Sequence, residues 1–313
     1  MYTLSLAVCV LFCAFLAAGC GEEADNAARS GCVEFVCTWG VRGTADGCFA
    51  GGPRGLTVGK NGSIYTIDKA GRVQEFSQEG RFISAWWPPD VSAGRPQDIE
   101  ADGVGNLYIA DTHYDRVLKY SGAGELLAQW GKNGSGPGEF VYPVGIAVDR
   151  TGNVYVSEYG AAHRIQKFDP EGRFLLEWGA FGEGDGEFNR PQDLAVGRAG
   201  EIFVADSCNH RIQVFSSDGK LLRKLGAAGD APGQFRYPYG LAVAPDGDVV
   251  VLEYGNSRVQ VIHADGSVEC SGKTGRGDLE FNSPWDVAIG ASGDLYVADT
   301  QNFRIQRLRL VPR

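Results

Sequence analysis

The 313-residue chain has little positive charge: 29 Lys and Arg residues stand against 39 Asp and Glu residues, which gives a net charge of −10. Because nucleic-acid binding depends on a basic surface, this balance argues against a nucleic-acid partner. The sequence also lacks a Cys-x-x-Cys motif, a Ser-His-Asp elbow motif, a Walker loop and a dinucleotide fingerprint. Thiol-redox, zinc-finger, esterase, nucleotidase and dinucleotide-dependent functions therefore find no support.

What the sequence does contain is one pattern repeated six times. Each copy begins Pro-x-(Gly/Asp)-apolar-Ala-Val, continues Gly-(Asn/Asp)-apolar-Tyr-Val-(Ala/Ser)-(Asp/Glu) and ends Arg-(Ile/Val)-Gln, with variations. The opening prolines lie 43, 47, 48, 47 and 46 residues apart, and they are Pro53, Pro96, Pro143, Pro191, Pro238 and Pro284. A period of about 40–50 residues in an all-strand unit is typical of a propeller blade.

The repeat that opens at Pro191 shows how each unit forms strands. Residues 194–196 are a short apolar run, residues 202–204 follow a turn glycine, residues 212–215 alternate, and residues 221–225 follow an Asp-Gly turn signal. The sequence therefore predicts an all-β fold, a six-bladed β-propeller of four-stranded antiparallel blades over residues 33–313. The segment Asn209-His210-Arg211-Ile212-Gln213 resembles the NHL repeat, which implies the same propeller but no single function.

The sixth unit ends after Leu308 without a fourth strand. Near the other end of the chain, Val33–Trp39 followed by Gly40 matches the fourth-strand segment that ends at Trp178-Gly179. We therefore expect residues 33–39 to complete the last blade as its outermost strand and so to close the ring.

The N-terminal segment is apolar and uncharged from Leu4 to Ala18. This length falls short of the roughly 20 residues of a membrane span and is typical of a signal-peptide core. Residues 16–20, Leu-Ala-Ala-Gly-Cys, resemble the lipobox of bacterial lipoproteins. The resemblance implies a signal peptide over residues 1–19, a lipidated Cys20, a tether over residues 20–32, and a lipid-anchored domain at the periplasmic or extracellular face of the bacterial cell envelope. An ordinary secretion signal and an uncleaved anchor are the alternatives.

Five cysteines remain in the exported domain, namely Cys32, Cys37, Cys48, Cys208 and Cys270. Because five is odd, at least one is free or pairs outside the chain, and the pairing among them stays open. The first three cluster in the closing segment, where a bridge would staple the ring. The alternative is that the cysteines serve as small buried apolar residues.

An alternating pattern marks the mouth of the predicted central channel. The third residue of each unit is Gly55, Gly145 or Gly240 in units one, three and five, and Asp98, Asp193 or Asp286 in the others. Three aspartates around one mouth would concentrate negative charge, and their oxygens suit a hard cation such as Ca²⁺. The three aspartates are therefore candidate ligand-binding and metal-binding residues. The alternative is that each accepts hydrogen bonds from backbone N–H groups nearby.

Two tyrosines complete the candidate site. Tyr159 and Tyr254 follow the second strands of units three and five, on the same face as the start of the first strands, which we call the top face. They would give an apolar, hydrogen-bonding rim for an organic ligand.

Once per unit, an arginine follows a carboxylate by four to six residues, which indicates structural ion pairs. The arginines are Arg72, Arg116, Arg164, Arg211, Arg258 and Arg304, and the carboxylates are Asp68, Asp111, Glu158, Asp206, Glu253 and Asp299.

Histidines are few, and their positions bear on enzyme function. The amidating lyases that share this repeat hold zinc through histidines placed directly after the opening proline. Here those positions are Arg54, Gln97, Val144, Gln192, Tyr239 and Trp285, so three-histidine zinc chemistry is not supported. His163 and His210 precede the repeat arginine, where we expect them to pack.

These observations predict a monomeric, exported and lipid-anchored propeller that binds an unknown protein or a small polar ligand through its top face. The alternative is an enzyme, either a Ca²⁺-dependent hydrolase similar to the lactonase propellers or one similar to the amidating lyases. No catalytic residue is identifiable. A scaffold in an envelope complex is a third class, which differs from the first only in its partner.

The lipobox resemblance predicts that palmitate becomes attached to Cys20. Metabolic labelling in a bacterial host should tag the wild-type chain, and Cys20→Ala should abolish the label because the acceptor sulfur is gone. The control variant Cys208→Ala should stay labelled. An unlabelled wild-type chain that is soluble outside the cell would disprove the lipoprotein assignment.

Overall fold

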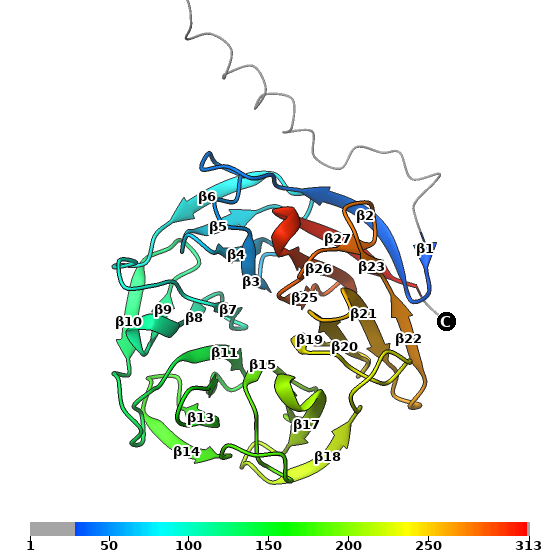
Figure 1. Cartoon of the computed structure of the whole chain (residues 1–313). Helices are drawn as coiled ribbons and strands as arrows, with labels where there is room; N and C mark the ends of the chain where they lie inside the picture. Colours follow the sequence, from blue (N-terminus) through cyan, green and yellow to red (C-terminus); the bar gives the residue numbers. More distant parts are fainter. Residues whose placement is uncertain (1–28, 312–313) are drawn as a thin grey trace, which may run out of the picture.

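The computed structural model describes residues 29–311, which form a ring of six blades around a central channel (Figure 1). Each blade contains four antiparallel strands, and its first strand lines the channel. Figure 1 looks along the channel, with β3, β7, β11, β15, β19 and β25 nearest the centre. The predicted six-bladed propeller is confirmed.

Blades 1 to 3 follow the chain from the inside of the ring outwards. Blade 1 comprises β3 (Pro53–Val58), β4 (Ile64–Asp68), β5 (Val73–Phe76) and β6 (Phe82–Trp86). Blade 2 comprises β7 (Asp98–Ala101), β8 (Leu107–Asp111), β9 (Arg116–Tyr120) and β10 (Leu126–Trp130). Blade 3 comprises β11 (Pro143–Val148), β12 (Val154–Glu158), β13 (Arg164–Phe168) and β14 (Phe174–Trp178).

Blades 4 and 5 repeat this order, and blade 6 takes its outer strand from the N-terminal side. Blade 4 comprises β15 (Pro191–Val196), β16 (Ile202–Asp206), β17 (Arg211–Phe215) and β18 (Leu221–Leu225). Blade 5 comprises β19 (Pro238–Val243), β20 (Val249–Glu253), β21 (Arg258–Ile262) and β22 (Val268–Ser271). Blade 6 comprises β25 (Val287–Ile289), β26 (Asp294–Asp299), β27 (Arg304–Leu310) and β2 (Val33–Trp39).

A few short elements complete the described residues. The strand β1 (Arg29–Ser30) pairs with β2, and β23 (Lys273–Thr274) pairs in parallel with β24 (Glu280–Phe281). Single 3-10 turns follow the second strands of blades 2, 4 and 6, and they are η1 (Thr112–Tyr114), η2 (Ser207–Asn209) and η3 (Thr300–Asn302). No helix within residues 29–311 is long and apolar enough to cross a membrane.

The core is divided among the six interfaces between neighbouring blades. The second strands, such as β16, are buried along their whole length, whereas outer strands such as β14 alternate between half-buried and exposed residues. Each of six apolar clusters joins side chains of two adjacent blades. The apolar core of the ring therefore lies mainly between neighbouring blades.

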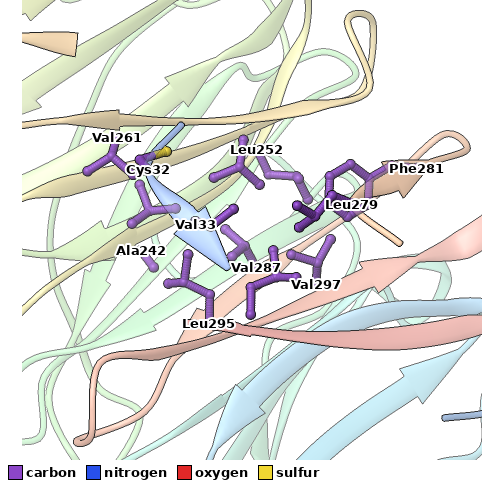
Figure 2. Packing of buried hydrophobic residues seen from close by; sticks show 13 residues of the cluster. Cys32, Val33, Ala242, Leu252, Val261, Leu279, Phe281, Val287, Leu295 and Val297 are labelled. Atoms are coloured by element: carbon purple, nitrogen blue, oxygen red, sulfur yellow. The ribbon is translucent and has the colours of Figure 1, made fainter. Parts of the chain in front are cut away.

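The predicted closure of the ring is confirmed. Strand β2 pairs with β27 from Val33 opposite Leu310 to Trp39 opposite Ile305. In Figure 1 the blue strand β2 lies alongside the red strand β27. Figure 2 shows Val33, which is 0% exposed, among apolar side chains of blades 5 and 6.

The packed region begins slightly before the expected boundary at Val33. Strand β1 lies in the segment assigned to the tether, and Cys32 belongs to the same apolar cluster as Val33. The Cys32 thiol lies 3.3 Å from Ser271 Oγ, and the Cys32 backbone N–H donates to that oxygen. Cys32 thus serves as a small buried residue. Residues 1–19 and Cys20 lie outside the described residues.

The closure predicts a strong position dependence for charged substitutions on outer strands. Val33→Asp should lower the free energy of unfolding by at least about 3 kcal/mol, because it places an unpaired carboxylate in an apolar interface. Ile83→Asp, at a residue of outer strand β6 that is 50% exposed, is the matched control and should cost little. Urea unfolding of both variants measures the difference. Equal stabilities would contradict the role of β2 in closing the ring.

Candidate functional site: the mouth of the central channel

Three of the predicted site residues line the central channel. The first strands of blades 3 and 4 shift register directly after the proline, between Pro143 and Gly145 and between Pro191 and Leu194. Such a bulge re-aims the side chains beside it. Asp98, Asp193 and Asp286 all line a cavity of about 150 Å³ inside the channel and a depression of about 10 Å³ on its top-face side. The predicted convergence of the three aspartates is thus observed, and they form the floor of the mouth.

Each of the three aspartates also links two blades. Asp98 accepts hydrogen bonds from the backbone N–H groups of Ile99 (2.8 Å) and, in blade 3, Ile146 (2.9 Å). Asp193 and Asp286 repeat this arrangement, each accepting from the residue that follows it and from Leu241 of blade 5 or Leu56 of blade 1. The hydrogen-bonding alternative is therefore present together with the shared cavity.

The alternation of aspartate and glycine has an architectural cause. A Cβ atom added to Gly55 would lie 2.6 Å from Asp98 Cα, and one added to Gly145 would lie 2.9 Å from Asp193 Cα. Real side chains do not approach that closely, so the odd blades need glycine where the even blades place aspartate. The alternation alone is therefore weak evidence for a ligand.

A fourth carboxylate, Glu100, lines the same channel cavity. It accepts a hydrogen bond of 2.8 Å from Thr57 Oγ1. Glu100 is not among the predicted site residues, although its position in the repeat holds alanine or threonine in every other blade.

Burial strongly perturbs these four acids. Desolvation raises the pKa of Asp98 to about 7, and desolvation with added repulsion from Asp98 raises the pKa of Glu100 to about 8. Desolvation and repulsion from the other channel aspartates also raise the pKa values of Asp193 and Asp286. Within residues 29–311, no group of three His, Cys, Asp or Glu side chains is arranged to hold a metal ion. The structure therefore gives no support to the calcium site expected at the three aspartates.

Aromatic and cationic side chains surround the mouth above this floor. Tyr239 stacks on Tyr254 with ring centroids 4.7 Å apart, and it meets Trp285 edge-on at 5.1 Å. The guanidinium of Arg54 lies 4.8 Å from the Trp285 ring, and the Lys69 ammonium lies 5.8 Å from that ring. These contacts connect blades 5, 6 and 1.

The same series continues through blades 4 and 3. The Arg190 guanidinium lies 5.6 Å from the Tyr239 ring and 5.2 Å from the Tyr159 ring. Tyr159 in turn stacks on Tyr142 at 5.7 Å. We call the whole set the mouth belt: Arg54, Lys69, Tyr142, Tyr159, Arg190, Tyr239, Tyr254 and Trp285. Both predicted rim tyrosines, Tyr159 and Tyr254, belong to it.

Local backbone and histidine contacts set the position of Arg190. This residue precedes its opening proline in a left-handed conformation (φ 60°), as Tyr142 does (φ 54°). His163 Nδ1 accepts a hydrogen bond of 3.0 Å from the Arg190 backbone N–H, and His210 Nδ1 accepts one from Tyr237. Burial lowers the pKa of His163, which favours the neutral ring that such acceptance requires. The expected packing role of both histidines is confirmed.

The predicted ion pairs form in five blades. Arg116, Arg164, Arg211, Arg258 and Arg304 each contact their carboxylate at 2.5–2.7 Å. In blade 1 the expectation is wrong, because the Arg72 guanidinium donates to the carbonyl oxygens of Thr44, Ala45 and Cys48. Asp68 instead accepts from the Arg72 backbone N–H. The arginines also hold the loops between blades, as where Arg211 donates to the Glu187 carbonyl.

The fold and the repeat define the class of protein. The family model of the NHL repeat matches residues 140–168, 188–215, 235–262 and 281–308, which include the first three strands of blades 3 to 6. The chain is thus an NHL-repeat protein with a six-bladed propeller. No curated protein is significantly similar to it in sequence.

Solved structures with the same fold differ in what they do. A virginiamycin B lyase from Staphylococcus aureus matches with a TM-score of 0.61 and 14% identity, over 90% of this chain and 100% of that one. A gluconolactonase from Xanthomonas campestris matches with a TM-score of 0.63 and 15% identity, over 84% and 87%. An auxiliary nutrient binding protein from Bacteroides thetaiotaomicron matches with a TM-score of 0.64 and 14% identity, over 82% and 69%. At these identities the likeness shows the fold alone.

The channel acids predict an unusual pH dependence of stability. The folded protein holds protons on Glu100 and Asp98 up to about pH 8 and pH 7, whereas the unfolded chain releases them near pH 4.5 and 3.8. Their contribution to stability is therefore complete below about pH 4 and is lost as the pH rises towards 8.

Glu100→Gln keeps an acceptor for Thr57 and removes one of these charges. It should raise the free energy of unfolding at pH 9, relative to the wild type, by about 1–3 kcal/mol and should flatten the pH profile. Glu125→Gln, at an exposed glutamate, is the control and should leave the profile unchanged. Urea unfolding from pH 5 to pH 9 measures both. A Glu100→Gln profile parallel to that of the wild type would refute the burial effect.

Proposed function

We propose that this chain binds a small organic molecule across the mouth belt on the top face of its propeller. The observation that carries the proposal is the belt itself, in which aromatic rings and cations from blades 1, 3, 4, 5 and 6 gather around one channel mouth. Small-molecule sites combine apolar and aromatic surfaces with a few polar groups that fix orientation.

The rings of the belt offer surface for such a contact. Tyr142 is 43% exposed, and Tyr159, Tyr254 and Trp285 are half-buried. The depression beneath them, lined by Tyr239 and Trp285, has a volume of only about 10 Å³. A ligand would therefore lie across the rings and would place no more than one group in the depression.

Binding fits the site better than catalysis does. The three aspartates of the floor accept backbone hydrogen bonds on both of their oxygens, so they are committed to holding blades together. His163 and His210 are occupied with loop backbones. Among the described residues, these aspartates and histidines therefore lend no support to the alternatives of a Ca²⁺-dependent lactonase-like hydrolase and of an amidating-lyase-like enzyme.

We also propose that the domain works outside the cytoplasm of a bacterium, anchored to its envelope through Cys20. Support for this comes from the lipobox resemblance of residues 16–20. An anchored propeller with a ligand-binding top face would suit the capture of molecules at the cell surface or in the periplasm.

Binding is tested with three compounds that share one phenol ring and differ in charge: 4-hydroxyphenylacetate, tyrosol and tyramine. We expect at least one of them to bind the wild-type chain in calorimetric titration. Trp285→Ala should weaken that binding about tenfold, because an aromatic contact is lost. Trp87→Ala, at a residue that is 52% exposed and outside the belt, is the control and should not change it. If none of the three compounds binds at millimolar concentration, the proposal is wrong.

A further inference from the structure

Three cations reach the mouth without an anionic partner. Arg54, Lys69 and Arg190 make no ion pair with any carboxylate in the part of the chain that the structure describes. By contrast, the repeat arginines of blades 2 to 6 all pair with a carboxylate. The protein has an excess of acidic residues, with a net charge of −10, so the lack of a counter-charge here is local.

These cations act on one another across the mouth. Arg54 lies over the Trp285 ring and Arg190 over the Tyr239 ring, and these two rings meet at 5.1 Å. Burial lowers the pKa of Arg54, and the charge of Arg190 adds to this effect. Burial and the charge of Arg54 likewise lower the pKa of Lys69. A half-buried group of like charges is unfavourable unless an anion joins it.

Two buried polar atoms at the mouth also lack a partner among the described residues. Gln97 is 6% exposed, lines the depression, and has no hydrogen-bond partner for its Oε1 atom. Arg54 Nε is buried and unpaired in the same way. Buried polar groups in folded proteins are nearly always hydrogen-bonded, so these two groups at the mouth are both available to the polar group of a ligand.

We propose that the mouth belt binds a carboxylate that carries an aromatic ring. The carboxylate would lie between Arg54 and Arg190, whose planar guanidinium groups suit a two-oxygen anion, with Lys69 close by. The ring would lie against the exposed parts of Tyr159, Tyr254 and Trp285. A hydroxyl or N–H group on the ligand would satisfy Gln97 Oε1. This inference rests on the proposed function and specifies its ligand.

The three phenols of the binding test separate this inference from the proposed function. We expect 4-hydroxyphenylacetate to bind at least about tenfold more tightly than neutral tyrosol, and tyramine to bind more weakly than either. Raising NaCl from 50 to 500 mM should weaken binding of the acid and leave binding of tyrosol unchanged, because salt screens the attraction between charges. If tyrosol binds as tightly as the acid, the anion inference is overturned while the binding function stands.

Replacing one cationic residue at a time shows which side chain binds the carboxylate of the ligand. Arg54→Gln and Arg190→Gln should each weaken binding of 4-hydroxyphenylacetate about tenfold, and this loss of affinity should exceed the loss of tyrosol affinity in the same variant. Arg173→Gln removes an exposed arginine that pairs with Asp169 in the connection between β13 and β14, and it serves as the matched control. Melting temperatures check that the variants fold. If the variants lose as much affinity for tyrosol as for the acid, both arginines have a packing role and the inference is overturned.

A carboxylate that carries an aromatic ring can belong to a small free acid or to the C-terminal aromatic residue of a polypeptide. Both sources have the proposed chemistry. The peptide Gly-Gly-Tyr as free acid, compared with its C-terminal amide, distinguishes the two sources. A free-acid peptide that binds more than about tenfold tighter than 4-hydroxyphenylacetate would identify a chain terminus, and equal affinities would identify a small acid. Binding of the amide as tight as that of the acid would contradict the carboxylate requirement in either source.

Discussion

The pairing of β2 with β27 is the constraint on which the rest of the molecule depends, because a ring of blades has no defined mouth until it closes. The belt draws its side chains from five of the six blades, and its contacts pass from blade to blade. Closure fixes the radius of the ring and therefore the separation of Arg54 and Arg190 across it. A strand at the start of the domain thus determines the geometry of a site to which it contributes no side chain.

The three aspartates at the floor of the mouth line the channel cavity and also connect neighbouring blades. Three carboxylates are buried around one cavity, where desolvation and mutual repulsion disfavour their charged forms. Each carboxylate is stabilised by hydrogen bonds from two backbone N–H groups, one of which belongs to the next blade. Removing an aspartate would thus disturb a blade interface as well as the cavity, so loss of binding in such a variant would not separate the two roles. Variants of the belt are more informative because the belt lies above this framework.

The fold could be read from the sequence because its signals are local and repeated. Each repeat marks its strands and turns with an opening proline and turn glycines, and six copies of the repeat make the assignment secure. The outer strand of the last blade is indicated by the match between Trp39-Gly40 and Trp178-Gly179. The site was only partly predictable. The convergence of Asp98, Asp193 and Asp286 follows from ring symmetry, but their hydrogen bonds to the next blade depend on where that blade places its backbone N–H groups, which residue type does not indicate.

Glu100 and the cations escaped prediction for different reasons. Glu100 departs from the alanine or threonine at the corresponding position of every other blade, but a single departure from a repeat does not by itself indicate a buried channel acid. Arg190 and Lys69 lie outside the repeated positions. Arg190 meets Tyr239 of the following blade, and Lys69 of blade 1 meets Trp285 of blade 6 at the other end of the chain. Contacts of this kind become visible only once the ring is assembled.

The acidity of the chain and the cationic mouth are compatible because charge acts locally. Interactions between exposed charges are largely screened beyond about 8–10 Å at physiological ionic strength, so carboxylates on the outer surface have little effect at the mouth. Four acids lie in the channel below the mouth, namely the three aspartates of the floor and Glu100, and burial raises the pKa of Asp98 to about 7 and that of Glu100 to about 8. Near neutral pH these acids therefore carry less negative charge than four ionised acids would. The burial that makes these acids costly to ionise thus also reduces their repulsion of an anion held by Arg54, Lys69 and Arg190.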